Sequence, residues 1–437
     1  MPGRGGAGLV NAAALRVRWG VLHGLPRYAL PRRAARGDKM ASLLLGYRGE
    51  PGGQYAQFDA IRAEGRIIGS EVGAASADHE VCREILRDKR FATLQPADFG
   101  FPGPLARLLE ITDPHLPNPV EPPSMLVSEP PSHTAYRHPI AKVFTPKAIT
   151  RLTDRARIVS EELLDDLAAA ARPDLVTGYA AKLPVTMIGR LLGLPEADDE
   201  YMLEWGEAAA PLLDPGLPWP VYLRAQRALR GLDDYLTAHF ARIRREPGSD
   251  DPFALLAASG ELTDRELVTN AALLIGAGFE TTVNLIGNGV VALLEHPDQL
   301  ERLRAEPDLW PNAVEEILRF SSPVQRTARV AREDGEIAGL RFRKGTVVSL
   351  LLAGANRDPA VFDRPHEFDV ARPEAKKNVS FGYGIHACIG AALARMEGAV
   401  GLQALFTRYP DLSLDGPGEH RGLSTLYGWA SLPARLK

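Results

Sequence analysis

A cysteine near the C-terminus lies in a glycine-rich stretch that constrains the fold more than any other segment. The stretch reads Phe-Gly-Tyr-Gly-Ile-His-Ala-Cys-Ile-Gly over residues 381–390, and an apolar run that predicts a helix begins at Ala391. Glycines let the backbone turn tightly and let a flat, bulky group approach the sulfur. The free N–H groups at a helix N-terminus favour a thiolate, so we expect a lowered pKa for Cys388. A soft thiolate held in this way suits iron.

This stretch resembles the haem-ligand loop of the cytochromes P450. The family pattern is Phe, two residues, Gly, one residue, His or Arg, one residue, Cys, one residue and Gly. Every fixed position is filled, by Phe381, Gly384, His386, Cys388 and Gly390. A buried free cysteine beside a helix is the alternative for Cys388 alone, and the complete pattern argues against it. The resemblance implies a haem b whose iron is bound by Cys388, in a loop that includes Gly382.

Composition and length favour one large globular unit. The chain has 437 residues, of which 45% are hydrophobic and 24% charged, and we find no internal repeat. We expect a single domain over residues 41–437. The net charge of -4 gives no reason to expect nucleic acid as a partner. Two distant cysteines, Cys82 and Cys388, fit a reducing compartment, so we expect a cytoplasmic protein.

Residues 1–40 form a basic, amphipathic N-terminal extension. The first 37 residues contain seven arginines and no acid, with apolar residues between them. Arg16 and Arg18 interrupt the apolar residues, so no signal peptide or membrane span is predicted. A transit peptide, a helix in weak contact with an anionic membrane surface, and a solvated extension that partly packs on the fold all remain open.

An irregular stretch precedes a short helix that carries two cations. Residues 93–131 are rich in proline and glycine, and the resemblance implies that they form a loop over the substrate. The next segment begins with Glu129, where the family more often has Asp, and places His133 and Arg137 on one helical face. Such a pair is often only a solvated face. The resemblance assigns both residues to the haem propionates, which need cationic or hydrogen-bonding partners.

One acid stands in the most apolar run of the chain, residues 270–294. The run is long enough to span a membrane, but Glu280, Asn284, Asn288 and four glycines favour a buried central helix instead. Burying an unpaired carboxylate is costly, so Glu280 requires an explanation. One explanation is an ion pair with an arginine or lysine elsewhere in the chain, and the other is a functional role.

Residues 277–282 resemble the family's oxygen-activation motif. The hydroxyl of Thr281 can bond the carbonyl of Ala277 and bend the helix, and Gly278 leaves space there for dioxygen and water. The resemblance assigns proton delivery to Glu280 and Thr281. We expect burial to raise the pKa of Glu280, which suits a group that passes protons inward from solvent.

A second motif, Glu316-x-x-Arg319, lies on a predicted helix over residues 310–320. Alone it is usually a surface ion pair, but it resembles the family's Glu-x-x-Arg motif, which pairs with a second arginine, here Arg372. The resemblance makes these three residues structural. After Pro323, alternation predicts small β-hairpins rather than a large sheet, and Arg329 resembles a propionate-binding arginine. With His386, His133 and Arg137 it would make four cations for two carboxylates.

The resemblance implies a mainly α fold with minor β-sheets, the cytochrome P450 prism, and a haem-thiolate monooxygenase. Two electrons and dioxygen would insert one oxygen atom into a substrate, with the thiolate favouring O–O cleavage. No dinucleotide fingerprint is found, so electrons from NAD(P)H are expected through a ferredoxin and its reductase. A peroxide-driven haem enzyme and a haem-binding sensor are the alternatives, and neither requires both Glu280 and Thr281. Leu274, Phe279 and Val324 are expected to contact a small hydrophobic substrate of lipid, terpenoid or steroid type.

Overall fold

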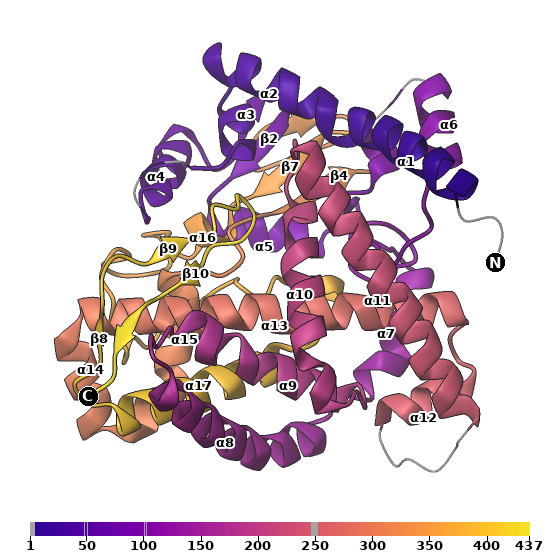
Figure 1. Ribbon diagram of the computed structural model, residues 1–437. Helices are drawn as coiled ribbons and strands as arrows, with labels where there is room; N and C mark the ends of the chain where they lie inside the picture. The colour runs from indigo at the N-terminus through magenta and orange to yellow at the C-terminus, as the bar shows by residue number, and fades with distance from the viewer. Residues whose placement is uncertain (1–4, 48, 50, 100, 102, 246–251) are drawn as a thin grey trace.

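Long α-helices surround one central helix, with small sheets at one side (Figure 1). The computed structural model describes residues 5–47, 49, 51–99, 101, 103–245 and 252–437. The helices are α1 Gly5–Trp19, α2 Leu25–Ala35, α3 Lys39–Leu44, α4 Gln54–Glu64, α5 His79–Arg87, α6 Gly103–Ile111, α7 Ser132–Ala141, α8 Pro146–Ala169, α9 Lys182–Leu191, α10 Asp199–Ala209, α11 Trp219–Arg245, α12 Pro252–Ser259, α13 Asp264–Glu295, α14 Pro297–Ala305, α15 Trp310–Phe320, α16 Leu352–Ala355 and α17 Ala391–Arg408. The mainly helical architecture is the one predicted.

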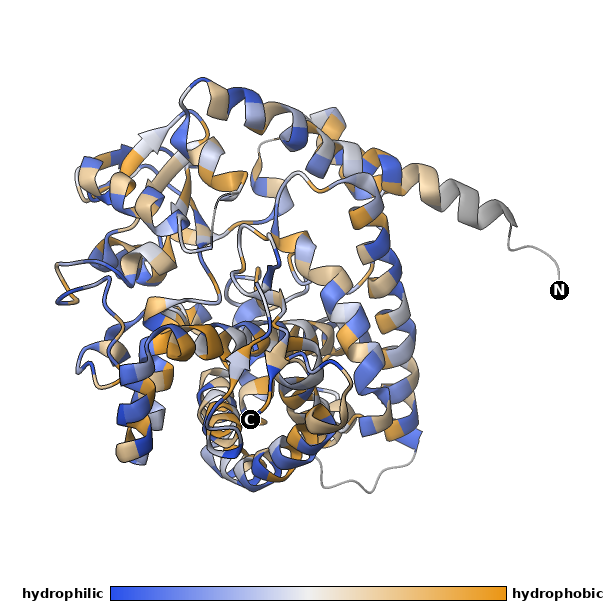
Figure 2. Ribbon diagram, turned by 60° about the vertical axis from the view of Figure 1, so that its left-hand side comes forward, coloured by the Kyte–Doolittle hydropathy of each residue, from blue (hydrophilic) through white to orange (hydrophobic). Residues whose placement is uncertain are grey.

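The central helix α13 begins at a capping box. The Thr263 side chain accepts a hydrogen bond from the Glu266 N–H, and the Glu266 carboxylate accepts one from the Thr263 N–H. Its length and apolar character would suit a membrane span, but 72% of its most apolar window is buried inside the fold. In Figure 1 it runs across the molecule, with the five-stranded sheet above it and α8 and α17 below it. Figure 2 shows hydrophobic residues along the helices in the lower centre of that view. Contacts with α9, α10, α11, α15 and α17 make α13 the core helix that the sequence predicted.

The α13–α17 contact depends on glycines. A Cβ added at Gly289 of α13 would lie 2.8 Å from a Leu402 methyl carbon of α17. Two glycines of α17, Gly398 and Gly401, likewise face Leu285 and Ile286 of α13. Since α17 directly follows the cysteine loop, this close packing fixes the loop relative to the middle of α13.

One five-stranded sheet has the order β1-β2-β7-β4-β3, where β2 and β7 are parallel and the other pairs antiparallel. Its strands are β1 Ile68–Ser70, β2 Gly73–Ser76, β3 Phe91–Thr93, β4 Thr327–Ala331 and β7 Val347–Leu350. The expectation of hairpins alone after Pro323 is therefore wrong for β4. Its partners β3 and β7 are short buried strands distant in sequence, which local alternation does not identify.

The remaining strands form two-stranded pairs. They are β5 Gly335–Ile337 with β6 Leu340–Phe342, β8 Ser413–Leu414 with β11 Ala434–Arg435, and β9 Glu419–His420 with β10 Trp429–Ser431. The pair β5–β6 is a small hairpin of the expected kind. The chain from β9 to β10, residues 419–431, is called the C-terminal hairpin below, and its turn lies beside residues 323–325.

The N-terminal helices pack across α6 and α11 (Figure 1). The side chains of Leu15, Val21 and Leu30 are buried, and the Trp19 indole donates a 2.8 Å hydrogen bond to the Leu217 carbonyl. Arg18 is buried and bonds Leu109 O and the Glu121 carboxylate. Residues 1–4 of the predicted extension lie outside the described residues. Residues from Leu15 to the expected boundary at residue 40 pack on the rest of the fold, so no structural break separates them from it.

Candidate functional site

The cysteine loop is a tight turn shaped by two glycines in left-handed conformation. Gly382 has φ +68° and Gly384 has φ +74°, and a Cβ at Gly384 would lie 2.4 Å from the Leu86 carbonyl oxygen. The Cys388 N–H donates a 2.8 Å hydrogen bond to Phe381 O, which closes the loop. The Phe381 ring is covered by the Arg395 guanidinium at 4.4 Å. The backbone therefore holds the sulfur at the start of α17, next to Gly390.

The Cys388 side chain is exposed, whereas Cys82 is buried. Protein atoms nevertheless crowd the thiol from the other sides, and this burial raises its pKa, against the lowering influence of the Gly390 N–H, Arg137 and Arg395. The expectation of a lowered pKa from the helix terminus alone is therefore wrong for the protein without a bound group. Desolvation outweighs one backbone donor and two nearby cations.

The middle of α13 is open where the rest of the helix is buried. Ala277 is exposed and Thr281, one turn later, is half-buried, while residues 267–275 and 282–290 are buried. The Thr281 hydroxyl donates a 2.8 Å hydrogen bond to Ala277 O, as the sequence predicted. An exposed stripe in the centre of a core helix marks a space inside the fold.

Gly278 does not open this space. A Cβ added there would lie 2.9 Å from a side-chain carbon of Ile188, so this glycine lets α9 pack closely on α13. The prediction that Gly278 leaves room for dioxygen is wrong. Gly276 is different, since a Cβ built there would have no atom within 4 Å among the described residues, apart from its chain neighbours and the adjacent backbone of its own helix.

Glu280 is buried and paired with Arg421 of the C-terminal hairpin, Oε1 to guanidinium 2.5 Å. Burial raises the pKa of Glu280, Arg421 lowers it, and Glu207 of α10 raises it further. The other oxygen, Oε2, is buried and has no hydrogen-bond partner among the described residues. The partner left open by the sequence is therefore Arg421. It was missed because 141 residues separate the two in the chain.

Four predicted haem-binding side chains come from three separate segments. The His133 and His386 rings lie against each other at a tilt of 52°, with centroids 4.3 Å apart, and Arg137 donates a 2.5 Å hydrogen bond to Ala387 O. Burial lowers the pKa of His133 to about 4, helped by His386 and Arg137. His133 is thus neutral at pH 7 in the protein without a bound group, and its contact with a haem propionate stays a prediction.

The remaining cation, Arg329 of β4, is buried without an ion-pair partner among the described residues. Its guanidinium donates to Ala328 O at 2.8 Å and to the Thr327 hydroxyl at 3.4 Å, and burial lowers its pKa to about 10. The His133 Nε2 atom is also buried without a hydrogen-bond partner. A buried arginine that has no acid partner among the described residues, and a buried imidazole whose Nε2 has no hydrogen-bond partner there, fit the carboxylates of a haem.

Glu129 holds His386 in place. Its Oε1 accepts hydrogen bonds from the Thr93 N–H at 2.6 Å, the Thr93 hydroxyl at 3.0 Å and His386 Nε2 at 3.3 Å. Burial alone would raise the pKa of Glu129, but the bonds from His386 and Thr93 lower it to about 2. Sequence analysis assigned no role to Glu129, although its place just before the helix that carries His133 and Arg137 was the signal available.

The Glu316, Arg319 and Arg372 side chains meet in the core, each no more than 2% exposed. Glu316 binds Arg319 through two hydrogen bonds of 2.7 and 2.8 Å and Arg372 through one of 3.1 Å. The remaining guanidinium donors bond backbone carbonyls, among them Glu367 O, which both arginines contact. The cluster therefore ties α15 to the chain around residues 356–372.

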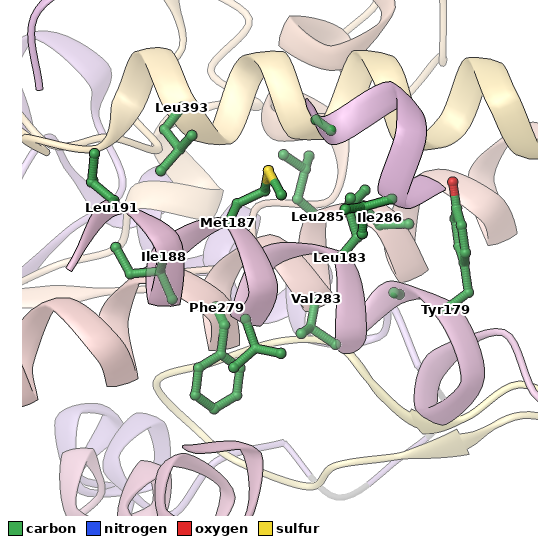
Figure 3. Packing of buried hydrophobic residues seen from close by; sticks show 14 of the residues in the cluster. Tyr179, Leu183, Met187, Ile188, Leu191, Phe279, Val283, Leu285, Ile286 and Leu393 are labelled. Carbon is green, nitrogen blue, oxygen red and sulfur yellow. The ribbon is translucent and has the colours of Figure 1, made fainter. Parts of the chain in front are cut away.

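Two of the three predicted substrate residues are core residues. Phe279 is 1% exposed, and its ring fills the place that a Cβ of Gly206 in α10 would occupy. Figure 3 shows Phe279 among the apolar side chains of α9 and α13. Leu274 is buried in the same cluster, so both predictions are corrected. Val324 is half-buried and forms a β-bridge with Leu426 of the C-terminal hairpin.

Comparison with known proteins decides which group these residues hold. The family model "Cytochrome P450" matches residues 216–415. The putative cytochrome P450 140 of Mycobacterium tuberculosis (strain ATCC 25618 / H37Rv) is 42% identical over 432 residues, 96% of this chain and 97% of the relative. The chain belongs to the cytochrome P450 family.

Two further members of the family are similar over most of the chain. The 6-deoxyerythronolide B hydroxylase of Saccharopolyspora erythraea is 39% identical over 320 residues, 72% of this chain and 78% of the relative. The crystal structure of P450BioI in complex with hexadec-9Z-enoic acid ligated acyl carrier protein superposes with a TM-score of 0.79 at 32% identity, covering 88% of this chain and 98% of that one. The fold is the cytochrome P450 fold.

As a cytochrome P450, the protein is a haem-thiolate monooxygenase with haem b as its cofactor and electrons supplied from NAD(P)H through redox partners. The donor set agrees with this cofactor. Among the described residues no three His, Cys, Asp or Glu side chains gather to hold an ion, whereas haem iron needs a single protein thiolate.

Proposed function

We propose that Cys388 binds the haem iron and that the haem fills the space beside Ala277 and Thr281. The observation that carries this proposal is the open stripe of Ala277 and Thr281 in the otherwise buried middle of α13. The exposed Cys388 lies at the start of α17, which packs directly on α13. When bound, the haem supplies the redox chemistry that splits dioxygen, with the thiolate donating electron density.

The loop and the cation-bearing segments would hold the rest of the group. Phe381, Gly382 and Gly390 shape the loop that brings the sulfur to the iron. Arg329, Arg137 and His386 supply charge or hydrogen bonds to the propionates, and neutral His133 supplies an N–H. Burial of Arg329 without an acid partner among the described residues is the strongest support for a carboxylate there.

We assign proton delivery to Thr281 and Glu280. The Thr281 hydroxyl faces the open space and is held by Ala277 O. Glu280 precedes it on the same helix and has one oxygen free of hydrogen bonds among the described residues. An acid and an alcohol side by side can hold and pass a proton between buried water and the reacting atoms.

The substrate would be a small hydrophobic organic molecule of lipid, terpenoid or steroid type. The hexadec-9Z-enoic acid in the P450BioI structure supports a substrate of lipid type, whereas the name of the 6-deoxyerythronolide B hydroxylase refers to a macrolide, which lies outside these three types. Val324, which is half-buried and forms a β-bridge with Leu426 of the C-terminal hairpin, remains the proposed substrate contact.

A ferredoxin and its reductase would supply the electrons to a cytoplasmic enzyme. Weak contact with an anionic membrane through residues 1–40 is also proposed. The outer face of α2 exposes Leu25 and Tyr28, 52% and 63%, beside the exposed Arg27, Arg32 and Arg36. Flotation with anionic liposomes tests it: the full chain should float more than a chain lacking residues 1–40. Equal flotation would reject the contact.

The carbon-monoxide difference spectrum of the reduced protein tests the core of the proposal. We expect the thiolate-type Soret band in the wild type and its loss in Cys388→Ala, with Cys82→Ala as the matched control that retains it. A band that survives in Cys388→Ala would reject the ligand assignment. Retained haem with no oxygenated product from any lipid, terpenoid or steroid tested, and no Soret shift on their addition, would favour a haem-binding sensor.

A further inference from the structure

The C-terminal hairpin carries the arginine that binds Glu280. The Arg421 guanidinium bonds Glu280 Oε1 at 2.5 Å and, through Nε, the Trp429 carbonyl at 3.1 Å. The Arg421 N–H bonds Gly428 O across the hairpin. The side chains of Arg421 and Glu280 are only 11% and 4% exposed. Because Arg421 is held at both its backbone and its Nε, the position of its charge depends on the position of the hairpin.

The turn of this hairpin is fixed by one carboxylate from another segment. Asp214 accepts hydrogen bonds from the Ser424 N–H at 2.7 Å, the Ser424 hydroxyl at 2.8 Å and the Thr425 N–H at 2.9 Å. The Thr425 hydroxyl also donates to Leu213 O at 3.2 Å. Arg326 donates to the Ser424 hydroxyl at 2.7 Å, and its charge faces Asp214. Two consecutive hairpin residues thus depend on Asp214.

Asp214 lies in the connection between α10 and α11, residues 210–218, called the α10–α11 connection here. Its outer side is held by the N-terminal helices, through Trp19 to Leu217 O and Arg27 to Gly216 O. Helix α10 also carries Glu207, whose charge faces Glu280. The connection therefore touches the hairpin on one side and leads into α10 on the other.

We propose that Arg421 is a positioning residue for Glu280, and that Asp214 couples the seating of the α10–α11 connection to that position. When the connection is seated, Asp214 holds the hairpin turn and Arg421 holds Glu280. When the connection leaves, the hairpin loses three hydrogen bonds to one carboxylate and the Glu280 carboxylate loses its fixed partner. The acid is thus in its working position only while the connection covers the site. This inference rests on the proposed role of Glu280 in proton delivery.

The charges around Glu280 predict the direction of the effect. Arg421 favours the ionised carboxylate, whereas burial and Glu207 disfavour it. Removing or displacing Arg421 leaves only the two influences that favour the protonated acid. The pH at which Glu280 ionises should therefore rise whenever the hairpin is released.

The test is an infrared pH titration of the haem-loaded protein, with the Glu280→Gln spectrum subtracted to isolate this carboxyl group. We expect Arg421→Gln to raise the midpoint by about one pH unit or more, a tenfold change in proton affinity. Asp214→Asn should raise it by a smaller amount. Arg421→Lys should restore most of the wild-type midpoint, which a purely structural role would not explain. Arg435→Gln, which removes an exposed partner of Asp415, is the control and should change nothing.

The coupling between Asp214 and Glu280 is tested by the titration of a double variant and by hydrogen exchange of the C-terminal hairpin. Asp214→Asn with Arg421→Gln should titrate as Arg421→Gln alone, because Asp214 acts through Arg421. Amides of residues 419–431 should exchange faster in Asp214→Asn. If the Glu280 midpoint in Arg421→Gln equals that of the wild type, Arg421 does not position Glu280. If the midpoint changes in Arg421→Gln but not in Asp214→Asn, Asp214 is not coupled to Glu280. If instead Glu280→Gln leaves the partition between product and peroxide unchanged, the proton-delivery role fails while these titrations still stand.

Discussion

Glu129 and His386 meet at 3.3 Å, although 257 residues separate them in the chain. The contact joins the end of the irregular 93–131 stretch to the cysteine loop. It explains how a loop with three glycines can hold one imidazole in a fixed orientation beside the proposed haem edge. The same carboxylate also receives two hydrogen bonds from Thr93 of β3, so the loop is anchored to the sheet.

This contact predicts how the free energy of unfolding falls as the pH becomes acidic. The folded pKa of Glu129, about 2, lies below its ordinary value of 4.5, so its stabilisation is complete above pH 4.5 and is lost as the pH falls towards 2. Glu129→Gln should lower the free energy of unfolding at pH 7 by about 1–2 kcal/mol, allowing for partial solvent screening. Urea unfolding at several pH values measures it. A deficit that stays the same at pH 7 and pH 3 would contradict the linkage.

Thr281→Ala should keep the haem but lose control of the proton supply. The variant removes the hydroxyl that bonds Ala277 O without touching the buried core. We expect normal haem content and a several-fold larger share of reducing equivalents released as peroxide, measured per NAD(P)H consumed. Thr282→Ser, which keeps the hydroxyl that bonds Gly278 O, is the control. An unchanged peroxide share would remove Thr281 from proton delivery.

Glu316→Gln should destabilise the whole fold. Arg319 and Arg372 would remain in the core facing a neutral amide, and breaking a buried ion pair typically costs about 3–5 kcal/mol. The expected result is little haem-loaded protein and a lower urea midpoint. Glu336 forms an exposed ion pair with Arg341. Glu336→Gln should therefore change the free energy of unfolding by less than about 1 kcal/mol. Similar yields of both variants would make the Glu316 cluster dispensable.

Protonation of the buried His23 is expected to release the N-terminal helices from the rest of the fold at acidic pH. Burial, with Arg18, lowers the pKa of His23 from 6.5 to about 4, so the stabilisation is complete above pH 6.5 and is lost as the pH falls towards 4. Protection of the amides of residues 15–35 against hydrogen exchange, corrected for the intrinsic rate, should fall between pH 6.5 and 4.5.

His23→Gln, which keeps an acceptor for the Leu217 N–H but does not titrate in this range, should abolish that pH dependence. His366→Gln replaces an exposed histidine that pairs with Asp59 of α4, and it serves as the control. A fall of the same size in His23→Gln would assign the release to another group.

Local pattern was enough to find the segments that carry the chemistry. The cysteine loop, the apolar helix with its acid and alcohol, and the Glu-x-x-Arg pair are each a few residues long, and their spacing follows from backbone geometry within one turn or loop. The hydrogen bond from Thr281 to Ala277 is a contact of this kind, since a threonine hydroxyl on a helix reaches the carbonyl four residues back. Such contacts are set by the sequence itself.

Which residues surround those segments depends on the tertiary structure. Nothing in the sequence near Gly278 or Phe279 tells that one packs on Ile188 and the other on Gly206, because a core helix is apolar on every side. Arg421 contacts Glu280 although 141 residues separate them in the chain, and Glu129 contacts His386 across 257 residues. A charge acquires a role when the chain brings its partner near and removes the water between them. That depends on packing, which sequence spacing does not contain.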